Sequence, residues 1–281
     1  MNHPRGPRAR KRFSQHFLRD TTVLTALAQA IAPQPSDHIV EIGPGHGELT
    51  ELLLPLVQRL DAIEIDRDLV VYLQKKFFGV DHLMIHSQDV LTVNFGALQQ
   101  EGALLRIVGN LPYHISTPIL FKLFSIPKSI QDIHIMLQKE VAERLTAAVN
   151  TAHYGRLSVM AQYYCQLVDL FTVDPGAFYP APQVDSAVIR MTPRVSSVLR
   201  AHDADQLSAL VKEAFTYRRK TLRNSLKKWV SATELETLSI SPEQRAQQLT
   251  VEDFIKISNM VSLRRMKGGD CDEIPAHSSS H

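Results

Sequence analysis

Hydrophobic residues along this chain follow two alternating patterns. Short apolar runs are typical of strands buried in a parallel sheet, and between them apolar residues recur every three or four positions, which predicts amphipathic helices. The predicted strands cover residues 38–43, 60–65, 82–86, 104–109 and 130–137, and the predicted helices cover residues 23–32, 48–58, 67–77, 116–124 and 139–149. This alternation predicts an α/β fold, in which an open, mostly parallel sheet carries helices on both faces. Pro55 is expected to strain the second of these helices.

The pattern changes toward the C-terminus. A further helix over residues 156–165 precedes two strand-like runs, 167–173 and 184–192, which we expect to pair antiparallel at the edge of the sheet. Beyond residue 195 the strand signals end, and three helical patterns follow, over residues 201–215, 216–230 and 251–266. The expected organisation is a basic N-terminal arm (1–19), an α/β domain (20–194), a small all-α domain (195–267) and a disordered polar tail (268–281).

Composition indicates an ordinary globular protein and disfavours a membrane-spanning or disulfide-rich one. The chain has 281 residues, of which 44% are hydrophobic, and no apolar run is long enough to cross a bilayer. Its two cysteines, Cys165 and Cys271, lie far apart and lack the spacing of a metal site or a disulfide framework. We therefore expect a cytoplasmic protein with no bound metal and no membrane contact.

Basic residues are concentrated in two segments, although the net charge is only +2. Residues 1–20 hold six basic side chains against Asp20, and residues 212–228 hold seven against Glu213, which leaves 18 basic and 27 acidic residues elsewhere. Two positive segments on an otherwise acidic chain favour a polyanionic partner such as RNA. Each segment alone is also compatible with a solvated arm or helix face. The candidate RNA contacts are Arg10, Lys11, Arg12, Arg218, Arg219, Lys220, Arg223 and Lys227.

The second basic segment has helical spacing. Its apolar residues Phe215, Leu222, Leu226 and Trp229 are predicted to share one face, and Arg219, Arg223 and Lys227 another. A basic face of this kind can contact RNA phosphates without reading sequence.

A glycine-rich turn, Gly43-Pro44-Gly45-His46-Gly47, follows the first predicted strand. Glycines there let the backbone approach a ligand where a Cβ would collide. Glu48 occupies the position of the third glycine in the dinucleotide fingerprint, and Glu41 ahead of the turn disfavours a pyrophosphate and suits a cationic ligand. An ordinary strand-to-helix turn is the alternative interpretation.

Acidic residues at the ends of two later strands support an adenosine-bearing cofactor. Glu64 lies about twenty residues beyond the turn, where a carboxylate can bind both ribose hydroxyls. Asp89 follows the third strand and can accept a hydrogen bond from an adenine amine. A single acidic residue at a strand end is usually a helix cap. Three acidic residues in step with the strands, Glu41, Glu64 and Asp89, favour S-adenosylmethionine as the cofactor.

The most informative residues are Asn110-Leu111-Pro112-Tyr113, directly after the fourth predicted strand. The exocyclic amine of a base is a poor nucleophile because its lone pair is delocalised into the ring. The Asn110 side-chain oxygen and the Leu111 carbonyl can accept its two hydrogens, so catalysis is mainly positioning. Pro112 stiffens the turn, and Tyr113 can stack on the base. An ordinary turn after a strand is the alternative.

A second aromatic segment supports chemistry on a base. Residues 175–185 form a stiff, proline-rich loop in which Phe178 can close over an extruded base opposite Tyr113. The alternative is a hairpin loop whose ring packs into the core. Together with the glycine turn, these motifs predict methyl transfer to a base nitrogen.

With these motifs, the chain resembles the ribosomal RNA adenine dimethyltransferase family, and within it the enzymes of the small subunit (16S). The resemblance runs from about residue 10 to residue 263 and rests on residues 10–18, the glycine turn, and residues 110–118, 136–141, 154–158, 178–186 and 218–221. It implies a Rossmann-like class I methyltransferase fold with an antiparallel edge hairpin and a small all-α domain.

The resemblance also implies an activity and a set of site residues. The activity is transfer of methyl groups from S-adenosylmethionine to N6 of two adjacent adenosines, in the loop of the 3′-terminal hairpin of 16S rRNA. The substrate is an immature small ribosomal subunit, and we expect the enzyme to be a monomer. His16 stands where the family commonly has Asn, so a side-chain contact would be altered and a backbone contact would survive. The residues carried over for the cofactor are His16, Leu18, Gly43, Glu64, Asp89 and Asn110.

Three other functions remain open from the sequence. A large-subunit (23S) rRNA adenine methyltransferase of the macrolide-resistance type shares the sheet and both target motifs, although residues 154–158 and 218–221 resemble the small-subunit enzymes more. A non-catalytic RNA-binding assembly factor is opposed by the intact Asn110, Tyr113, Glu64 and Asp89. A nicotinamide dehydrogenase is disfavoured by Glu48 in the fingerprint.

Overall fold

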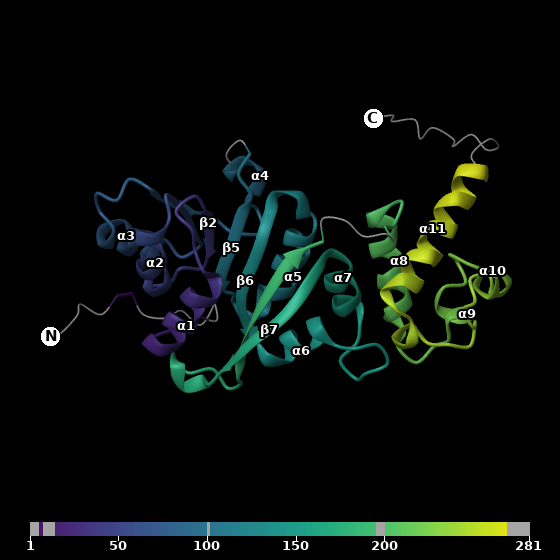
Figure 1. The fold of residues 1–281 in the computed structure, drawn as a ribbon. Coiled ribbons are helices and arrows are strands. Elements are labelled where there is room, and N and C mark those ends of the chain that lie inside the picture. The colour runs from purple at the N-terminus through teal and green to yellow at the C-terminus, as the bar shows by residue number, and fades with distance from the viewer. Residues whose placement is uncertain (1–5, 8–14, 100–101, 195–199, 269–281) are drawn as a thin grey trace, which may run out of the picture. The chain divides into compact units, whose positions relative to one another are not determined.

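The computed structural model describes residues 6–7, 15–99, 102–194 and 200–268. The chain divides into two compact units (Figure 1), the first made of Met1–Ala147 and Met160–Val195, the second of Ala148–Val159 and Ser196–His281. Most of the predicted basic arm and nearly all of the predicted tail lie outside the described residues.

The first unit is built on a seven-stranded sheet in the order β4–β3–β2–β5–β6–β9–β7. Its parallel strands confirm the predicted apolar runs: β2 (His38–Ile42), β3 (Arg59–Glu64), β4 (Leu83–Ser87), β5 (Leu105–Asn110) and β6 (Ile130–Gln138). The antiparallel edge pair is also confirmed, with β9 (Ser186–Pro193) between β6 and the edge strand β7 (Cys165–Val173). Because β2 lies between β3 and β5, the strand order reverses there, and this is where ligands bind in open α/β sheets.

Helices connect the parallel strands, as the alternating pattern predicts (Figure 1). Pro55 ends the second one early: α2 stops at Leu53 and a 3₁₀ turn covers Leu54–Leu56, so the expected helix over 48–58 is too long. Proline has no N–H to donate, and its ring clashes with the carbonyl four residues earlier. The helices are α1 (Thr21–Ile31), α2 (Glu48–Leu53), α3 (Arg67–Lys76), α4 (Phe95–Leu98), α5 (Ser116–Phe124), α6 (Lys139–Thr146) and α7 (Arg156–Tyr164).

A second, two-stranded sheet joins distant parts of the chain. β1 (Phe17–Leu18) pairs antiparallel with β8 (Phe178–Tyr179), with Phe17 opposite Tyr179 and Leu18 opposite Phe178. The Arg19 backbone N–H extends this contact by donating to the Ala177 carbonyl at 2.8 Å. The sequence does not predict this pairing, because two residues are too few to show a periodicity. It brings the N-terminal segment to the loop that carries Phe178.

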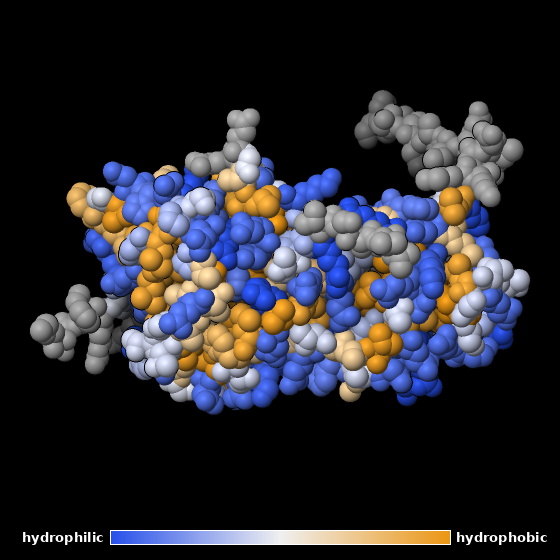
Figure 2. Space-filling model, viewed as in Figure 1, coloured by the Kyte–Doolittle hydropathy of each residue, from blue (hydrophilic) through white to orange (hydrophobic). Residues whose placement is uncertain are grey.

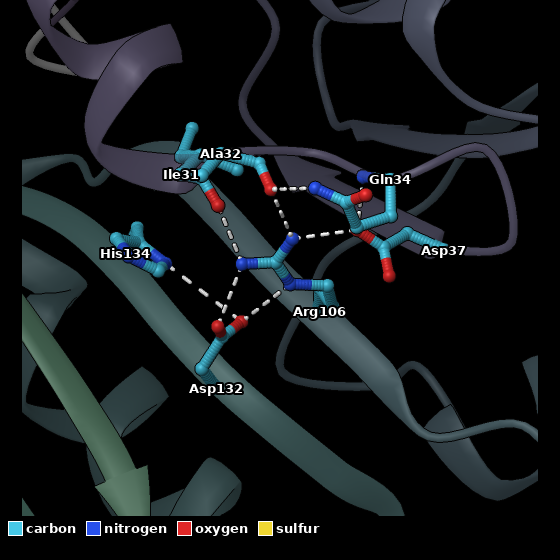
Figure 3. Close-up of polar contacts among 7 residues, drawn as sticks. All are labelled: Ile31, Ala32, Gln34, Asp37, Arg106, Asp132 and His134. Carbon is cyan, nitrogen blue, oxygen red and sulfur yellow. Dashed lines mark hydrogen bonds and ion pairs between the residues drawn. The ribbon is translucent and has the colours of Figure 1, made fainter.

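A buried cation ties α1 to the sheet at the start of β5. The Arg106 side chain is 6% exposed and donates from Nη1 to Asp37 at 2.6 Å. It also donates to both carboxylate oxygens of Asp132 on β6, at 2.9 and 2.7 Å, and from Nη2 to the Ile31 carbonyl at 2.6 Å (Figure 3). Ile31 is the last residue of α1, so Arg106 satisfies a carbonyl that the helix itself leaves unpaired.

A buried carboxylate joins three strands in the same unit. Asp61 of β3 is 0% exposed and accepts hydrogen bonds from His38 of β2 at 2.5 Å and His86 of β4 at 2.6 Å. Arg59, which is more exposed, donates to it at 2.9 Å. Burial by itself would raise the pKa of Asp61, but these three partners together hold that pKa far below its ordinary value. Asp61 is therefore ionised and has several hydrogen-bond donors at once.

The second unit is helical, with α8 (Ala204–Thr216), α9 (Leu222–Ser225), α10 (Ala232–Thr237) and α11 (Val251–Gly268). The single helix expected over 216–230 is wrong, since beyond Thr216, the last residue of α8, only Leu222–Ser225 is helical there. The Leu222 and Arg223 amides donate to the Gln244 and Pro242 carbonyls, so they make no helical bond. Sequence reasoning missed α10, although its capping box of Ser231 and Glu234 is a recognisable start signal.

Hydrophilic residues cover most of the face of the molecule shown in Figure 2, with hydrophobic residues interspersed. Among the described residues, no helix combines the length and the apolar character needed to cross a bilayer. The described residues also contain no group of three His, Cys, Asp or Glu side chains that could hold a metal ion.

Candidate active site

A cleft lies at the carboxyl ends of β2, β3 and β5, where the strand order reverses. The cleft brings together eight of the residues predicted for the cofactor or the target base. These are His16, Leu18, Gly43, Glu64, Asn110, Leu111, Pro112 and Tyr113.

The glycine turn begins where β2 ends and leads into α2. Gly43, Gly45 and Gly47 have φ values of 69°, 61° and 79°, in the left-handed region that other residues rarely adopt. A Cβ on Gly45 would also lie 2.9 Å from the Phe17 ring. Glycine is therefore required by both backbone geometry and space, and the N-terminal segment packs directly on the turn.

Sequence reasoning did not single out Gly109, the residue directly before Asn110. It lies opposite Ile42 in the register of β5 and β2, and a Cβ there would lie only 2.3 Å from the Ile42 carbonyl oxygen. A glycine inside a buried strand is the signal for such a close backbone approach. Gly43 follows Ile42, and Asn110 follows Gly109. The cofactor motif and the target motif are therefore neighbours.

Two buried acids line the cleft. Glu41 is 2% exposed, and its carboxylate accepts a hydrogen bond from the Thr50 hydroxyl at 2.6 Å. The pKa of Glu41 is raised to about 7, mainly by burial; the hydrogen bond from Thr50 opposes this, and the nearby Glu48 and Glu64 add to it. Burial likewise raises the pKa of Glu64 to about 6, although the Asp66 amide donates to it at 2.9 Å. A cationic ligand in this cleft would favour the ionised form of both acids.

The target motif has a fixed geometry. The Asn110 side-chain Nδ2 donates to the His16 carbonyl at 2.9 Å, so the amide oxygen is the end left to accept from a ligand. The Leu111 amide donates to the Met136 carbonyl of β6 at 3.0 Å, which anchors the backbone of Leu111 directly before its carbonyl. Pro112 precedes a 3₁₀ turn, Tyr113–Ile115, that runs into α5.

Tyr113 is held from two sides. Its hydroxyl forms a 2.8 Å hydrogen bond with the hydroxyl of Ser186, which is fully buried on β9. Its ring stacks on the His16 ring, with centroids 5.5 Å apart and planes at 23°. His16 Nδ1 donates to the Pro180 carbonyl at 2.7 Å. The His16 side chain therefore contacts the target motif, and its backbone carbonyl holds Asn110.

Asp89 and Phe178 lie outside the set of described residues that line the cleft. Asp89 follows β4, and its carboxylate accepts a hydrogen bond from the Leu91 amide at 2.9 Å. Phe178 is 5% exposed in a hydrophobic cluster that includes Leu18 and Val188. The roles predicted for Asp89 at an adenine and for Phe178 over a flipped base therefore remain predictions.

Five candidate RNA contacts lie in the second unit, and all are exposed. Arg218 donates to Gln247 at 3.4 Å and to the Ala152 carbonyl, and Arg223 forms an ion pair with Glu243 at 3.1 Å. The other three are Arg219, Lys220 and Lys227. The candidates Arg10, Lys11 and Arg12 lie outside the described residues.

We expect Ser186→Ala to lower kcat/KM for methyl transfer about fivefold, because the Tyr113 ring loses the hydrogen bond that orients it, worth about 1 kcal/mol. Tyr113→Phe removes the same bond and should have a similar effect. A steady-state double-mutant cycle checks this: the double variant should lose about as much as either single variant. Multiplying effects would show that the two hydroxyls act independently, and equal thermal unfolding of the variants controls for folding.

The chain is similar to known proteins over nearly its whole length. A family model described as ribosomal RNA adenine dimethylase matches residues 6–263. A protein from Coxiella burnetii (strain CbuG_Q212), named ribosomal RNA small subunit methyltransferase A, is 53% identical over 253 residues, covering 90% of this chain and 98% of that protein. A protein of the same name from Marinobacter nauticus is 46% identical over 262 residues, covering 93% and 95%.

Solved structures show the same fold. A dimethyladenosine transferase from Plasmodium falciparum has a TM-score of 0.75 and 28% identity, covering 90% of this chain and 98% of that one. The 23S rRNA methyltransferase ErmE has a TM-score of 0.67 and 24% identity, covering 88% and 99%. With the family model matched over nearly the whole chain and curated relatives near 50% identity, this chain belongs to the ribosomal RNA adenine dimethylase family.

Proposed function

We propose that this enzyme dimethylates N6 of two adjacent adenosines in the loop of the 3′-terminal hairpin of 16S rRNA. The proposed substrate is the immature small subunit in the cytoplasm, and the proposed active form is a monomer. Relatives named for the small subunit are 46–53% identical to this chain, which favours it over the large-subunit alternative. The likeness to ErmE, at 24% identity, supports the fold alone.

The family and fold imply S-adenosylmethionine, which supplies an electrophilic methyl group on a sulfonium ion. The residues of the cleft fit such a ligand. Glu64 can accept hydrogen bonds from both ribose hydroxyls, and the buried Glu41 carboxylate favours a positively charged ligand. Gly43 and Gly45 let the backbone approach it, and the Phe17–Leu18 segment covers the turn.

The observation that carries the proposal is the position of the Asn110 motif next to the glycine turn. A Cβ on Gly43 would lie 3.6 Å from the Asn110 backbone oxygen, so the two motifs are in contact. The Asn110 side-chain oxygen and the Leu111 carbonyl are proposed to accept the two N6 hydrogens. The base nitrogen then presents its lone pair toward the cofactor side of the cleft. Positioning of this kind is a large source of rate enhancement.

Cofactor binding is expected to release protons near pH 6.5. Without ligand the pKa values of Glu41 and Glu64 are about 7 and about 6, and a bound cation lowers both, so affinity should rise as the pH rises through this range. Calorimetric titrations in two buffers with different ionisation enthalpies measure the release. Glu64→Gln should reduce it, and identical binding enthalpies in the two buffers would contradict the prediction.

The same raised pKa values make the ligand-free protein less stable as the pH rises, whereas cofactor affinity is expected to increase. In the folded protein without ligand, both acids hold their protons to a higher pH than the ordinary value of 4.5. Their contribution to stability is therefore fully present below about pH 4.5 and is lost as the pH rises toward 7, because the unfolded chain ionises first.

The proposed function is tested by transfer of tritiated methyl groups from labelled cofactor to unmethylated small subunits, with large subunits as the comparison. Nucleoside analysis should show N6,N6-dimethyladenosine in the small-subunit RNA alone. Label in large-subunit RNA would favour the 23S alternative. A protein that binds small subunits without transferring label would favour a non-catalytic assembly factor.

A further inference from the structure

Three Phe, Tyr or Trp side chains are exposed among the described residues. They are Phe78 at 90%, Tyr179 at 61% and Tyr217 at 53%. An exposed ring on a protein that acts on RNA is a candidate for stacking on an unpaired base. Phe78 follows α3 and Tyr217 follows α8, whereas Tyr179 belongs to β8, one residue after Phe178. Its position relative to the target motif sets it apart from the other two.

A short row of contacts joins Tyr179 to the target motif. The carbonyl of the next residue, Pro180, accepts the 2.7 Å hydrogen bond from His16 Nδ1, and the His16 ring stacks on Tyr113. Exposure increases along this row, from the half-buried Tyr113 to the exposed Tyr179. Tyr179 does not itself line the cleft. It therefore lies beside the target motif, on the solvent side of it.

The pairing of β1 with β8 sets the direction of the Tyr179 ring. Tyr179 lies opposite Phe17 in the register, and Phe178 lies opposite Leu18. Opposed residues of an antiparallel pair project from the same face, and successive residues project from opposite faces. Leu18 and Phe178 pack together in the hydrophobic core, so Tyr179 shares the other face with Phe17, which lines the cleft. The Tyr179 ring is thus directed away from the core.

A cation restrains this ring. The guanidinium carbon of Arg19 lies 4.5 Å from the centroid of the Tyr179 ring, a cation–π contact. The Arg19 backbone is fixed by the hydrogen bond from its N–H to the Ala177 carbonyl. Arg19 covers one face of the ring, and most of the Tyr179 surface is still exposed. A ring that is already restrained loses less conformational freedom when a base stacks on it.

We propose that Tyr179 stacks on the adenosine next to the one being methylated, with Arg19 holding the ring in place. The inference rests on the proposed function, in which the substrate is a pair of adjacent adenosines. When one base enters the cleft, its neighbour loses a stacking partner, and the Tyr179 ring replaces it. Tyr179 is then a positioning residue, because holding the neighbouring base fixes which adenosine reaches Asn110.

The first test compares Tyr179→Ala with Tyr179→Phe in the full-length protein. Tyr179→Ala should lower kcat/KM for unmethylated small subunits about tenfold, because a stack between a base and an aromatic ring is lost. Tyr179→Phe keeps the ring and should stay within about twofold of the wild type. A value for Tyr179→Ala within twofold of the wild type would overturn the proposal, and so would an equal loss in Tyr179→Phe.

Phe78→Ala is the matched control for removal of an exposed ring. Phe78 lies in the same unit, in the loop between α3 and the edge strand β4. This variant should methylate small subunits at the wild-type rate. A loss as large as that of Tyr179→Ala would show a general effect of removing surface rings and would contradict the proposal.

The second test removes the base instead of the ring. Small subunits are reconstituted with 16S rRNA that lacks one or the other of the two adenine bases, and methylation of the remaining adenosine is measured. For at least one of these substrates the wild type should lose about tenfold, and Tyr179→Ala should then react as fast as the wild type, because the stack is already absent. A structural defect would persist without the base. Losses that multiply on both substrates would therefore overturn the proposal.

These measurements separate the stacking contact from the proposed function. If the wild-type protein does not methylate small subunits, the proposed function fails and the stacking proposal fails with it. If the wild type methylates them and Tyr179→Ala does so equally well, the stacking proposal alone fails.

Discussion

Asn110→Ala is expected to lower the rate constant for methyl transfer at least about a hundredfold, and up to about a thousandfold, the range seen when one polar group that stabilises a transition state is removed. The variant loses the amide oxygen proposed to accept from the target amine. It also loses the Nδ2 bond to the His16 carbonyl. Single-turnover transfer of labelled methyl groups, with cofactor and subunits both saturating, measures the effect.

A second variant, Asn110→Asp, separates the loss of the acceptor oxygen from the loss of the Nδ2 bond to His16. It keeps an acceptor oxygen toward the base and loses the donor to His16, so it should keep more activity than Asn110→Ala. Binding to small subunits should stay within about twofold for both variants, because backbone contacts of the RNA dominate its affinity. A rate for Asn110→Ala within tenfold of the wild type would refute the assigned role.

Arg106→Met is expected to lower the free energy of unfolding of the first unit by about 3–5 kcal/mol, a large part of the stability of a typical domain. The substitution keeps an apolar stem but leaves Asp37 and Asp132 without their cation, both of them largely buried. It also leaves the Ile31 carbonyl without its donor. Because Leu24 and Leu27 of α1 line the cleft, cofactor binding should weaken as well.

Urea unfolding followed by circular dichroism measures this loss, and Arg59→Met is the matched control. The Arg59 side chain is 30% exposed, and its partner Asp61 keeps His38 and His86 as donors when Arg59 is removed. The control should cost clearly less than Arg106→Met, because the Asp61 carboxylate keeps two donors while Asp37 and Asp132 lose their cation. If Arg106→Met costs no more than Arg59→Met, the buried network does not hold α1 to the sheet.

The sheet could be predicted because each parallel strand is a short, mostly apolar segment that local sequence reveals. The register of β2 against β5 could not, since it depends on contacts between distant residues. That register places Asn110 beside Gly43. Gly109 carried a readable signal, a glycine in a buried strand, but the sequence does not say which backbone approaches it.

The partners of the charged residues in the core could not be predicted from local sequence either. Arg106 lies in an apolar strand, which marks it as unusual, but its partners Asp37 and Asp132 belong to other segments. Likewise, nothing local to residues 16–18 predicts the pairing of β1 with β8 or the stacking of His16 on Tyr113. Where local pattern misled, as over residues 216–230, the amides of Leu222 and Arg223 found partners near Gln244 that no helical periodicity reveals.

The most direct test of the account is a crystal structure of the protein with S-adenosylhomocysteine and adenosine monophosphate bound. We expect the Asn110 side-chain oxygen and the Leu111 carbonyl oxygen each to lie about 3 Å from the adenine N6, a hydrogen-bond distance. The N6 atom should face the sulfur of the cofactor product, across the junction of Gly43 and Asn110. An adenine bound elsewhere, or either oxygen turned away from N6, would contradict the account.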